Sequence, residues 1–435
     1  MKHSAYTYIV AGVLCLCAIL AVFFLLVMPG LTAVPEPPAA LADTADTTPA
    51  ISPEDAEVIH TLTLAVVDAR LSLGFNNHST QRALTQLVED FNAQNPDLTV
   101  TVYDYDSISA IEQALKSGDA PDMFLLSASD SQQHRLWEYC TDLSVLLDSD
   151  SEYSPESFVG GLYSGSTRDG ILPWLPYDFT AMSFTVQPIP DQEQTLSLSL
   201  AAHEAEDRGI MLFPTCWDRQ MLTHWLSSYI FAACAAEENT LDQNELATLL
   251  ELIKEHPSTF EDMPEDHNYF LAPVFLDTVS CVSQLSHYEY DRERGGGDYA
   301  YTGLPDVCPG GVLTVNTCFG VFSSCEAPDV AWSFLRGLLS DEMQSASQCL
   351  PAVSSALHAG LDTSSRLLIV ERSDAAARLF EVLDSIEYVD FGIPGIGSII
   401  CSCAEKYFSG ECTAQEAAAA LQRHMDEMIC NIKEK

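Results

Sequence analysis

Short apolar runs alternate with helical patterns over the first part of the chain after residue 60. Three runs have the composition of strands: Leu62–Val67, Leu98–Tyr105 and Met123–Leu126. Between them, Thr80–Asn95 and Ile108–Lys116 place their apolar residues on one helical face, and Pro96 and Gly118 stop them. This order predicts a parallel sheet covered by helices, in which ligands bind beyond the carboxyl ends of the strands.

The later part of the chain continues the mixed pattern. Helical spacing of apolar residues predicts helices over Leu241–His256, Val274–Tyr288 and Pro328–Leu339, and Val312–Phe322 has the composition of a strand. A last helix is expected to begin at Thr413, because Thr413-Ala-Gln-Glu416 has the spacing of a capping box.

The N-terminus carries an uncharged apolar segment, Tyr8–Met28. At about 1.5 Å per residue it is long enough to cross a hydrocarbon core of about 30 Å. Lys2 precedes it, so the positive flank is expected to stay inside and the rest of the chain to be exported. A signal peptide cut near Ala40-Leu41-Ala42 is the alternative, but this site lies far from the apolar segment. We therefore favour a membrane anchor over residues 1–28.

Residues 29–60 are rich in Pro, Ala, Thr and Asp and predict an extended linker. The whole chain has 435 residues, with 63 acidic and 19 basic side chains and a net charge of −44. This excess of acidic groups argues against nucleic acid as a partner, because phosphate contacts need clustered Lys and Arg. Hydrophobic residues make up 47%, which predicts globular domains. The 14 cysteines leave the disulfide pairing open.

The sequence contains no pattern that singles out catalytic, metal-binding or cofactor-binding residues. Gly161–Gly165 has the wrong spacing for a nucleophile elbow, and His203-Glu204 does not extend to a zinc-protease pattern. Gly295–Gly297 lacks the Lys of a phosphate-binding loop. We therefore expect no enzyme, no cofactor and no metal, although a pair of glycosidase carboxylates stays open among so many acidic residues.

Several stretches, in this order along the chain, resemble one family. They are LTQLVEDFNAQNPDLTVTV, ALKSGDAPDMFLL, Asp142-Leu143, YTGLPDVCPGGVLTVNTCFGVFSSCEAPDVAWSFLRGLLSDEMQSASQCLPAV and KYFSGECTAQEAAAALQRHMDEM. Together they are similar to the extracellular solute-binding proteins of ABC transporters, family 1, the maltodextrin-binding type. The stretch VQPIPDQEQTLSLSLAAHEAEDRGIMLF departs from the family pattern, as does the lack of a lipidation cysteine.

The resemblance implies a two-lobed α/β fold of the periplasmic-binding-protein type II, with a hinge. Residues 61–179 and 301–348 would form lobe 1, and residues 180–300 and 349–435 would form lobe 2. A small solute, most simply a carbohydrate, would bind between the lobes, and hinge closure would enclose it. The expected partners are ABC permease subunits, with the protein a monomer on the outer face of the cytoplasmic membrane.

Candidate ligand-binding residues follow from strand ends, from helix starts and from the family pattern. A sugar needs flat aromatic faces for its C–H surfaces and carboxylates or amides for its hydroxyls. The candidates are Trp174, Tyr177, Asp178, Trp217, Asp218, Asp68, Arg70, Ser127, Asp130, Asn316 and Phe319. Trp137 and Trp332 are expected to lie in the core.

The expected function is therefore the capture of a carbohydrate for an ABC importer. The negative charge keeps a polyamine or another cation open as the ligand. Two different functions also stay open: a surface sensor that kept the fold without transport, and an extracellular glycosidase.

Overall fold

The computed structural model describes residues 60–67, 78–168, 170–186, 206–207, 223, 243–255, 274–279, 281, 300–302, 312–367, 380–391 and 396–433. All of these residues belong to one unit, Val58–Lys435.

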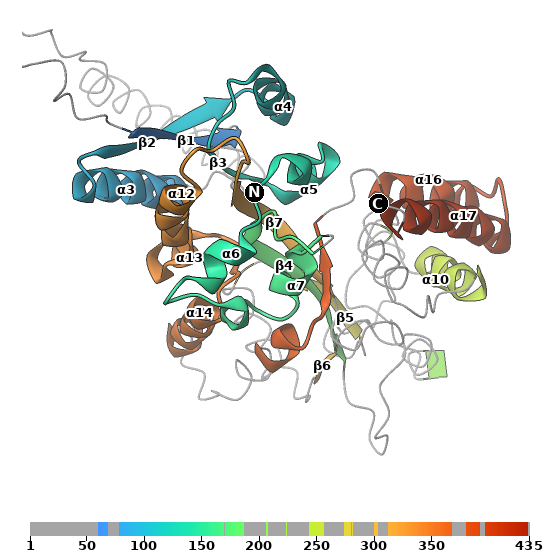
Figure 1. Ribbon diagram of the computed structural model, residues 1–435. Helices are drawn as coiled ribbons and strands as arrows, with labels where there is room; N and C mark the ends of the chain where they lie inside the picture. Colours follow the sequence, from blue (N-terminus) through green and yellow to red (C-terminus); the bar gives the residue numbers. More distant parts are fainter. Residues whose placement is uncertain are drawn as a thin grey trace, which may run out of the picture. The chain divides into compact units, whose positions relative to one another are not determined.

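The first five elements form a parallel, helix-linked arrangement (Figure 1). They are β1 (His60–Val67), α3 (His78–Gln94), β2 (Leu98–Tyr105), α4 (Ile108–Ser117) and β3 (Met123–Ser127). Strand β1 pairs in parallel with both β2 and β3. Helix α4 has well-defined ends, because Ser107 caps its first turn and Gly118, with φ of 88°, ends it in the left-handed conformation that favours glycine. The sheet predicted from the sequence is confirmed here.

Later strands extend this sheet. The order is β2-β1-β3-β7-β4-β5, where β4 is Leu175–Val186, β5 is Val274–Val279 and β7 is Val312–Val321. Strand β7 runs antiparallel to both β3 and β4. Three short strands complete the pairing: β6 (Ala300–Thr302) and β8 (Leu350–Pro351) on β4, and β9 (Tyr388–Asp390) on β7. The register between β4 and β7 shifts on both sides of Asp178, so a bulge interrupts the ladder at this residue.

Further helical segments surround the sheet. They are α5 (Ala128–Gln133), η1 (Leu136–Tyr139), α6 (Ser144–Asp148), η2 (Pro155–Ser157), α7 (Leu162–Ser166), α12 (Pro328–Leu335), η5 (Arg336–Leu339), α13 (Asp341–Ala346) and α14 (Ser354–Leu367). Helix α3 packs with α12, where the Phe91 and Phe334 rings meet edge to face at 5.3 Å. It also contacts α13, because the Thr80 hydroxyl donates to the carbonyl of Ala346 at 2.8 Å.

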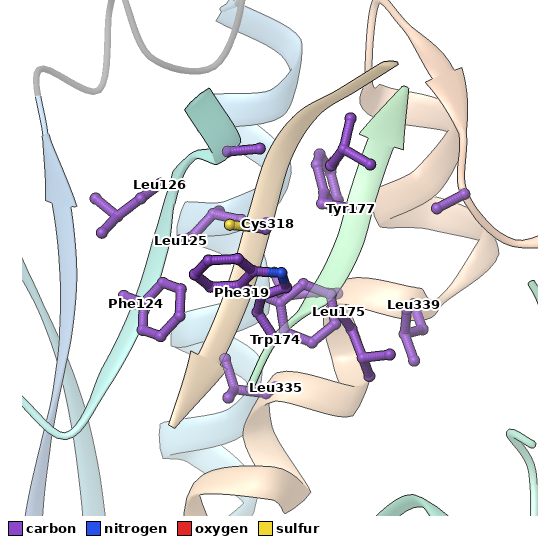
Figure 2. Packing of buried hydrophobic residues seen from close by; sticks show 14 of the residues in the cluster. Phe124, Leu125, Leu126, Trp174, Leu175, Tyr177, Cys318, Phe319, Leu335 and Leu339 are labelled. Carbon is purple, nitrogen blue, oxygen red and sulfur yellow. The ribbon is translucent and has the colours of Figure 1, made fainter. Parts of the chain in front are cut away.

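The hydrophobic core lies on the central strands. The largest fully buried side chains come mainly from β3, β4 and β7, and Figure 2 shows Trp174, Leu175 and Phe319 packed together. Leu175 and Phe319 are also direct partners in the β4–β7 ladder. Because the core depends on close packing, Gly320 has no room for a side chain: a Cβ there would lie 2.7 Å from the Phe124 ring.

Three helices pack on one another: α10 (Gln243–Glu255), α16 (Ile396–Phe408) and α17 (Ala414–Lys433) (Figure 1). The Lys254 ammonium lies 4.0 Å from the Tyr407 ring centroid and joins α10 to α16. The capping box predicted for α17 is confirmed, since the Glu416 backbone N–H donates to the Thr413 hydroxyl and the Thr413 N–H donates to the Glu416 carboxylate at 2.9 Å.

Most predicted elements agree with the structure, and one prediction is wrong. Residues 274–279 form strand β5, not the first turns of a helix, because they pair antiparallel with residues 181–186 of β4. No helix in the described residues is both long and apolar enough to cross a membrane. The predicted anchor, Tyr8–Met28, and the linker to residue 59 lie outside the described residues.

Candidate functional site

Two tryptophans meet where the chain leaves α7 for β4. The Trp174 ring is fully buried, and its centroid lies 6.0 Å from that of Trp137, with the two rings almost perpendicular. On another side, the Phe391 ring packs on Trp174 at 5.6 Å. We call Trp137, Trp174, Phe391 and the neighbouring Arg168 the tryptophan cluster. Its members come from η1, from the residues before β4 and from the residue after β9, so tertiary packing alone brings them together.

The Arg168 guanidinium lies over both tryptophans of the cluster. Its central carbon is 4.8 Å from the Trp137 centroid and 5.7 Å from the Trp174 centroid, within the range of cation–π attraction. One Nη donates a hydrogen bond of 2.5 Å to Oε1 of Gln132 on α5. A guanidinium held in this way has a fixed orientation, as ligand recognition requires.

A second arginine contacts the same tryptophan. The Arg135 guanidinium lies 5.6 Å from the Trp137 centroid, and it forms an ion pair with Glu138. Arg135 is the one non-glycine residue in the described part of the chain with a positive φ, at 51°. Backbone strain of this kind often occurs at functional sites.

Helix α5 places polar side chains beside β7. Ser127, at the end of β3, caps α5 with its hydroxyl, which turns the chain directly from strand into helix. Ser131 is therefore fully buried next to Cys318 of β7. Burial raises the pKa of the Cys318 thiol to about 12, while the Ser131 hydroxyl and the positive charge of Arg168 oppose the increase. This electrostatic coupling places Arg168, Ser131 and Cys318 close to one another.

Two buried nitrogens, one in the tryptophan cluster and one on β7, have no hydrogen-bond partner in the described residues. They are Nε1 of Trp174 and Nδ2 of Asn316. Asn316 lies at a register shift of the β4–β7 ladder, between Thr317, which pairs with Asp178, and Val315, which pairs with Phe179. Because native interiors pair nearly all buried polar groups, each of these two nitrogens is available to donate a hydrogen bond to a water or to a bound group.

Asp178 occupies the bulge of β4 and is almost fully buried. Its Oδ2 accepts a hydrogen bond of 2.7 Å from the Ser347 hydroxyl, whereas its Oδ1 has no partner in the described residues. Burial raises the pKa of this carboxyl from 3.8 to about 6, and hydrogen bonds from Ser347 and Thr317 only partly oppose it. The carboxyl therefore titrates near neutral pH.

The residue before the bulge fixes this part of β4 to α13. The Tyr177 hydroxyl donates to the Met343 carbonyl at 2.6 Å. The Gln344 side chain donates to the Tyr177 carbonyl and accepts from the Val353 backbone N–H. Burial raises the pKa of the Tyr177 phenol, so it remains a neutral donor. Residues 177–178 and 343–353 are thereby held as one unit.

The structure distributes the predicted ligand-binding residues unevenly. Trp174, Tyr177 and Phe319 are fully buried, Asp178 is nearly so, Asn316 and Ser127 are half-buried, and Asp130 is exposed. Asp68, Arg70, Trp217 and Asp218 lie outside the described residues. Trp332 is buried as predicted, whereas Trp137 is only partly buried at the edge of the core. Ligand contact by any of these residues stays a prediction.

Sequence reasoning missed Arg168, Ser131 and Gln132. Arg168 lies in a polar stretch, Ser-Thr-Arg-Asp-Gly, which is typical of a turn. Nothing local to it indicates that it packs on Trp137. In the described residues, no group of His, Cys, Asp and Glu side chains could hold a metal ion.

The fold resembles that of solved solute-binding proteins. Superposition on a sugar transporter from Rhizobium etli in an open conformation gives a TM-score of 0.57 at 14% identity, covering 84% of this chain and 99% of the other. The sugar-binding protein MalE from Xanthomonas citri gives 0.56 at 15% identity, covering 86% and 98%. This chain has the fold of the extracellular solute-binding proteins.

A third structure agrees. An extracellular solute-binding protein of family 1 from Alicyclobacillus acidocaldarius gives a TM-score of 0.54 at 13% identity, covering 86% of this chain and 100% of the other. No protein-family model and no curated protein sequence matches the chain. The resemblance seen in the sequence is therefore confirmed at the level of the α/β fold.

Proposed function

We propose that this chain is the solute-binding component of an ABC importer and that its ligand is a carbohydrate. The N-terminal segment Tyr8–Met28 anchors it to the outer face of the cytoplasmic membrane, and permease subunits receive the ligand. Residues 61–179 and 301–348 form one lobe and residues 180–300 and 349–435 the other, with closure at the hinge enclosing the solute.

The tryptophan cluster is the observation that carries this proposal. Solved structures of the same fold include proteins described as sugar-binding, and a sugar ring needs aromatic faces beside hydrogen-bonding groups. Trp137 and Trp174 supply the faces, while Trp174 and Asn316 supply buried nitrogens that have no hydrogen-bond partner in the described residues.

A ligand screen on the full-length chain tests the proposal. Thermal unfolding is followed with a panel of neutral and acidic oligosaccharides, with spermidine and with short peptides. A true ligand present at a hundredfold excess over its Kd adds about 2.7 kcal/mol to the free energy of unfolding. Saturable stabilisation by a sugar without its turnover supports the proposal. Stabilisation by spermidine alone, or turnover of the sugar, contradicts it.

Two variants connect the ligand to the tryptophan cluster. Trp137→Ala removes a partly buried aromatic face of the cluster and is expected to weaken binding by about tenfold or more, as loss of an aromatic contact does. Trp332→Phe is the matched control, because Trp332 is buried elsewhere and donates to Asp150 at 2.9 Å. Equal affinities of the two variants would show that the ligand binds away from the cluster.

A further inference from the structure

Strand β2 forms one edge of the sheet (Figure 1). Near the start of this edge, the Asn92 side chain of α3 covers Val100: its Oδ1 accepts from the Val100 backbone N–H at 2.7 Å, and its Nδ2 donates to the Val100 carbonyl at 3.1 Å. Successive residues of a strand direct these backbone groups to opposite sides, so Val102 and Asp104 direct theirs away from β1, as Val100 does. Within the part of the chain that the structure describes, no strand pairs with this side of β2.

The second half of β2 is exposed on both of its faces. Val102 is 38% exposed and Tyr103 57%, although neighbouring side chains of a strand point to opposite faces of the sheet. Thr101 and Asp104 are exposed as well. An open edge of this kind is a template for pairing with another strand. Because Asn92 covers only the start of β2, the second half can accept an extended segment.

The charges around this edge select the segment. Between Arg82 and Lys116 the chain has six acidic residues and no basic one. Asp97 precedes β2, whereas Asp104 and Asp106 lie at its end, and all three are exposed. A second copy of this chain would bring the same acidic residues to the edge, and the net charge of −44 opposes its approach. Charge complementarity therefore favours a basic segment of a different protein.

Two tyrosines add a further feature that favours basic side chains. The ring centroids of Tyr103 and Tyr105 lie 5.1 Å apart, so both rings are on the same side of β2. A Lys or Arg side chain over such a ring gains cation–π attraction. Asp104 points to the opposite face, where a carboxylate attracts the same side chains. Both faces of β2 therefore favour a basic residue.

We propose that the edge of β2 is a docking surface for an extended, basic segment of a partner protein, which adds to the sheet as a further strand. The outward backbone groups of Val102 and Asp104 bind the backbone of the segment. Its Lys and Arg side chains contact the tyrosine rings and the carboxylates. The main-chain hydrogen bonds give the affinity, and the charges give the choice of partner. This docking is independent of the proposed capture of a solute.

The experiment measures binding of model peptides to the full-length chain by fluorescence anisotropy. The probe is a labelled octapeptide in which Lys or Arg alternates with Val or Thr. One analogue carries Glu in place of each basic residue, and another is N-methylated at alternate backbone nitrogens. The basic peptide is expected to bind about tenfold more tightly than either, because the acidic edge repels Glu and N-methylation removes hydrogen-bond donors. Binding should also slow hydrogen exchange of the Val102 and Asp104 amides.

Variants assign the binding to β2. Val102→Pro removes an outward N–H, a change that edge strands tolerate, and should weaken binding of the basic peptide about tenfold. Asp104→Asn combined with Asp106→Asn should weaken it about threefold to tenfold, and a salt concentration of about 0.5 M should reduce this difference. Glu251→Gln combined with Glu255→Gln is the matched control, because it removes two exposed acidic groups from α10 and should change the affinity less than about twofold.

The outcomes decide between this surface and its alternatives. If no peptide binds, if either analogue binds as tightly as the basic peptide, or if Val102→Pro leaves the affinity unchanged, the docking surface is refuted. If the free protein forms a dimer that Val102→Pro dissociates, the occupant is a second copy and the basic partner is refuted. If Val102→Pro fails to fold, the N-methylated analogue and the hydrogen exchange of the two amides decide.

Discussion

Replacing the buried carboxyl of Asp178 should stabilise the protein more as the pH rises. The folded-state pKa is about 6 against an ordinary 3.8, so the folded protein holds this proton more tightly than the unfolded chain. Well below pH 3.8 the carboxyl is protonated in both the folded and the unfolded state, so its ionisation does not change the free energy of unfolding. Between the two pKa values only the unfolded chain ionises, so stability is lost as the pH rises. Above pH 6 the loss is complete, at about 3 kcal/mol for a shift of about two units.

The substitution Asp178→Asn removes this titration without changing the side-chain volume. Its amide oxygen can still accept the hydrogen bond from Ser347. Relative to wild type, the variant should gain about 2 kcal/mol at pH 5 and about 3 kcal/mol at pH 8, as linkage from the two pKa values gives. The introduced Asn side chain brings an N–H₂ group without a partner, and this lowers the gain in stability by a similar amount at both pH values. The increase of about 1 kcal/mol between the two pH values is therefore the diagnostic quantity.

Urea denaturation at pH 5, 6, 7 and 8 measures the difference, and this range stays above the isoelectric point of about 4.2. Many other acidic groups titrate here, but they cancel in the difference between variant and wild type. Glu89→Gln, at an exposed position of α3, is the control and should change the free energy of unfolding by less than about 0.5 kcal/mol. If the free energies of unfolding of Asp178→Asn and wild type differ by the same amount from pH 5 to pH 8, the argument that burial raises the pKa of this carboxyl is refuted.

Two further predictions test the packing around the site. Gly161→Ala should lower the free energy of unfolding by about 1–3 kcal/mol, because the new Cβ would lie 2.8 Å from the backbone carbonyl carbon of Glu387. An unchanged midpoint of urea denaturation would contradict this close approach. The Cys318 thiol, which is fully buried with its pKa raised to about 12, should not react with a disulfide reagent at pH 8 until the protein unfolds. Mass spectrometry of labelled peptides from the wild type and from a Cys318→Ala variant identifies the labelling of Cys318. Rapid labelling of Cys318 in the native protein would contradict its burial.

The sequence predicted the regular elements well where a single pattern dominates. Strand β2 has the bounds expected from its alternation, and α4 begins and ends within one residue of the prediction because Ser107 and Gly118 mark its ends. Strand β5 was misjudged, because six residues with apolar side chains at both ends fit a helical spacing as well as a strand. Only its pairing with β4 decides between the two, and this contact is not local.

The candidate site was predictable only in part. Trp174, Asp178 and Asn316 were named as candidates from the resemblance to the family, yet the structure buries all of Trp174 and nearly all of Asp178. Arg168 was missed because its role depends on Trp137 and Gln132, which lie 31 and 36 residues earlier in the chain. Side-chain stacking across such separations leaves no periodic signal in the sequence.

Strand β4 also constrains how the chain folds as it is synthesised. Its partners β5, β6, β7 and β8 all come later in the chain, and the Tyr177 hydroxyl bonds to Met343, 166 residues further on. Strands β1, β2 and β3, by contrast, find one another within a short segment. An emerging chain can therefore assemble its first three strands early, while the apolar residues of β4 wait for most of the protein to be synthesised. That interval is when a holding chaperone would matter most.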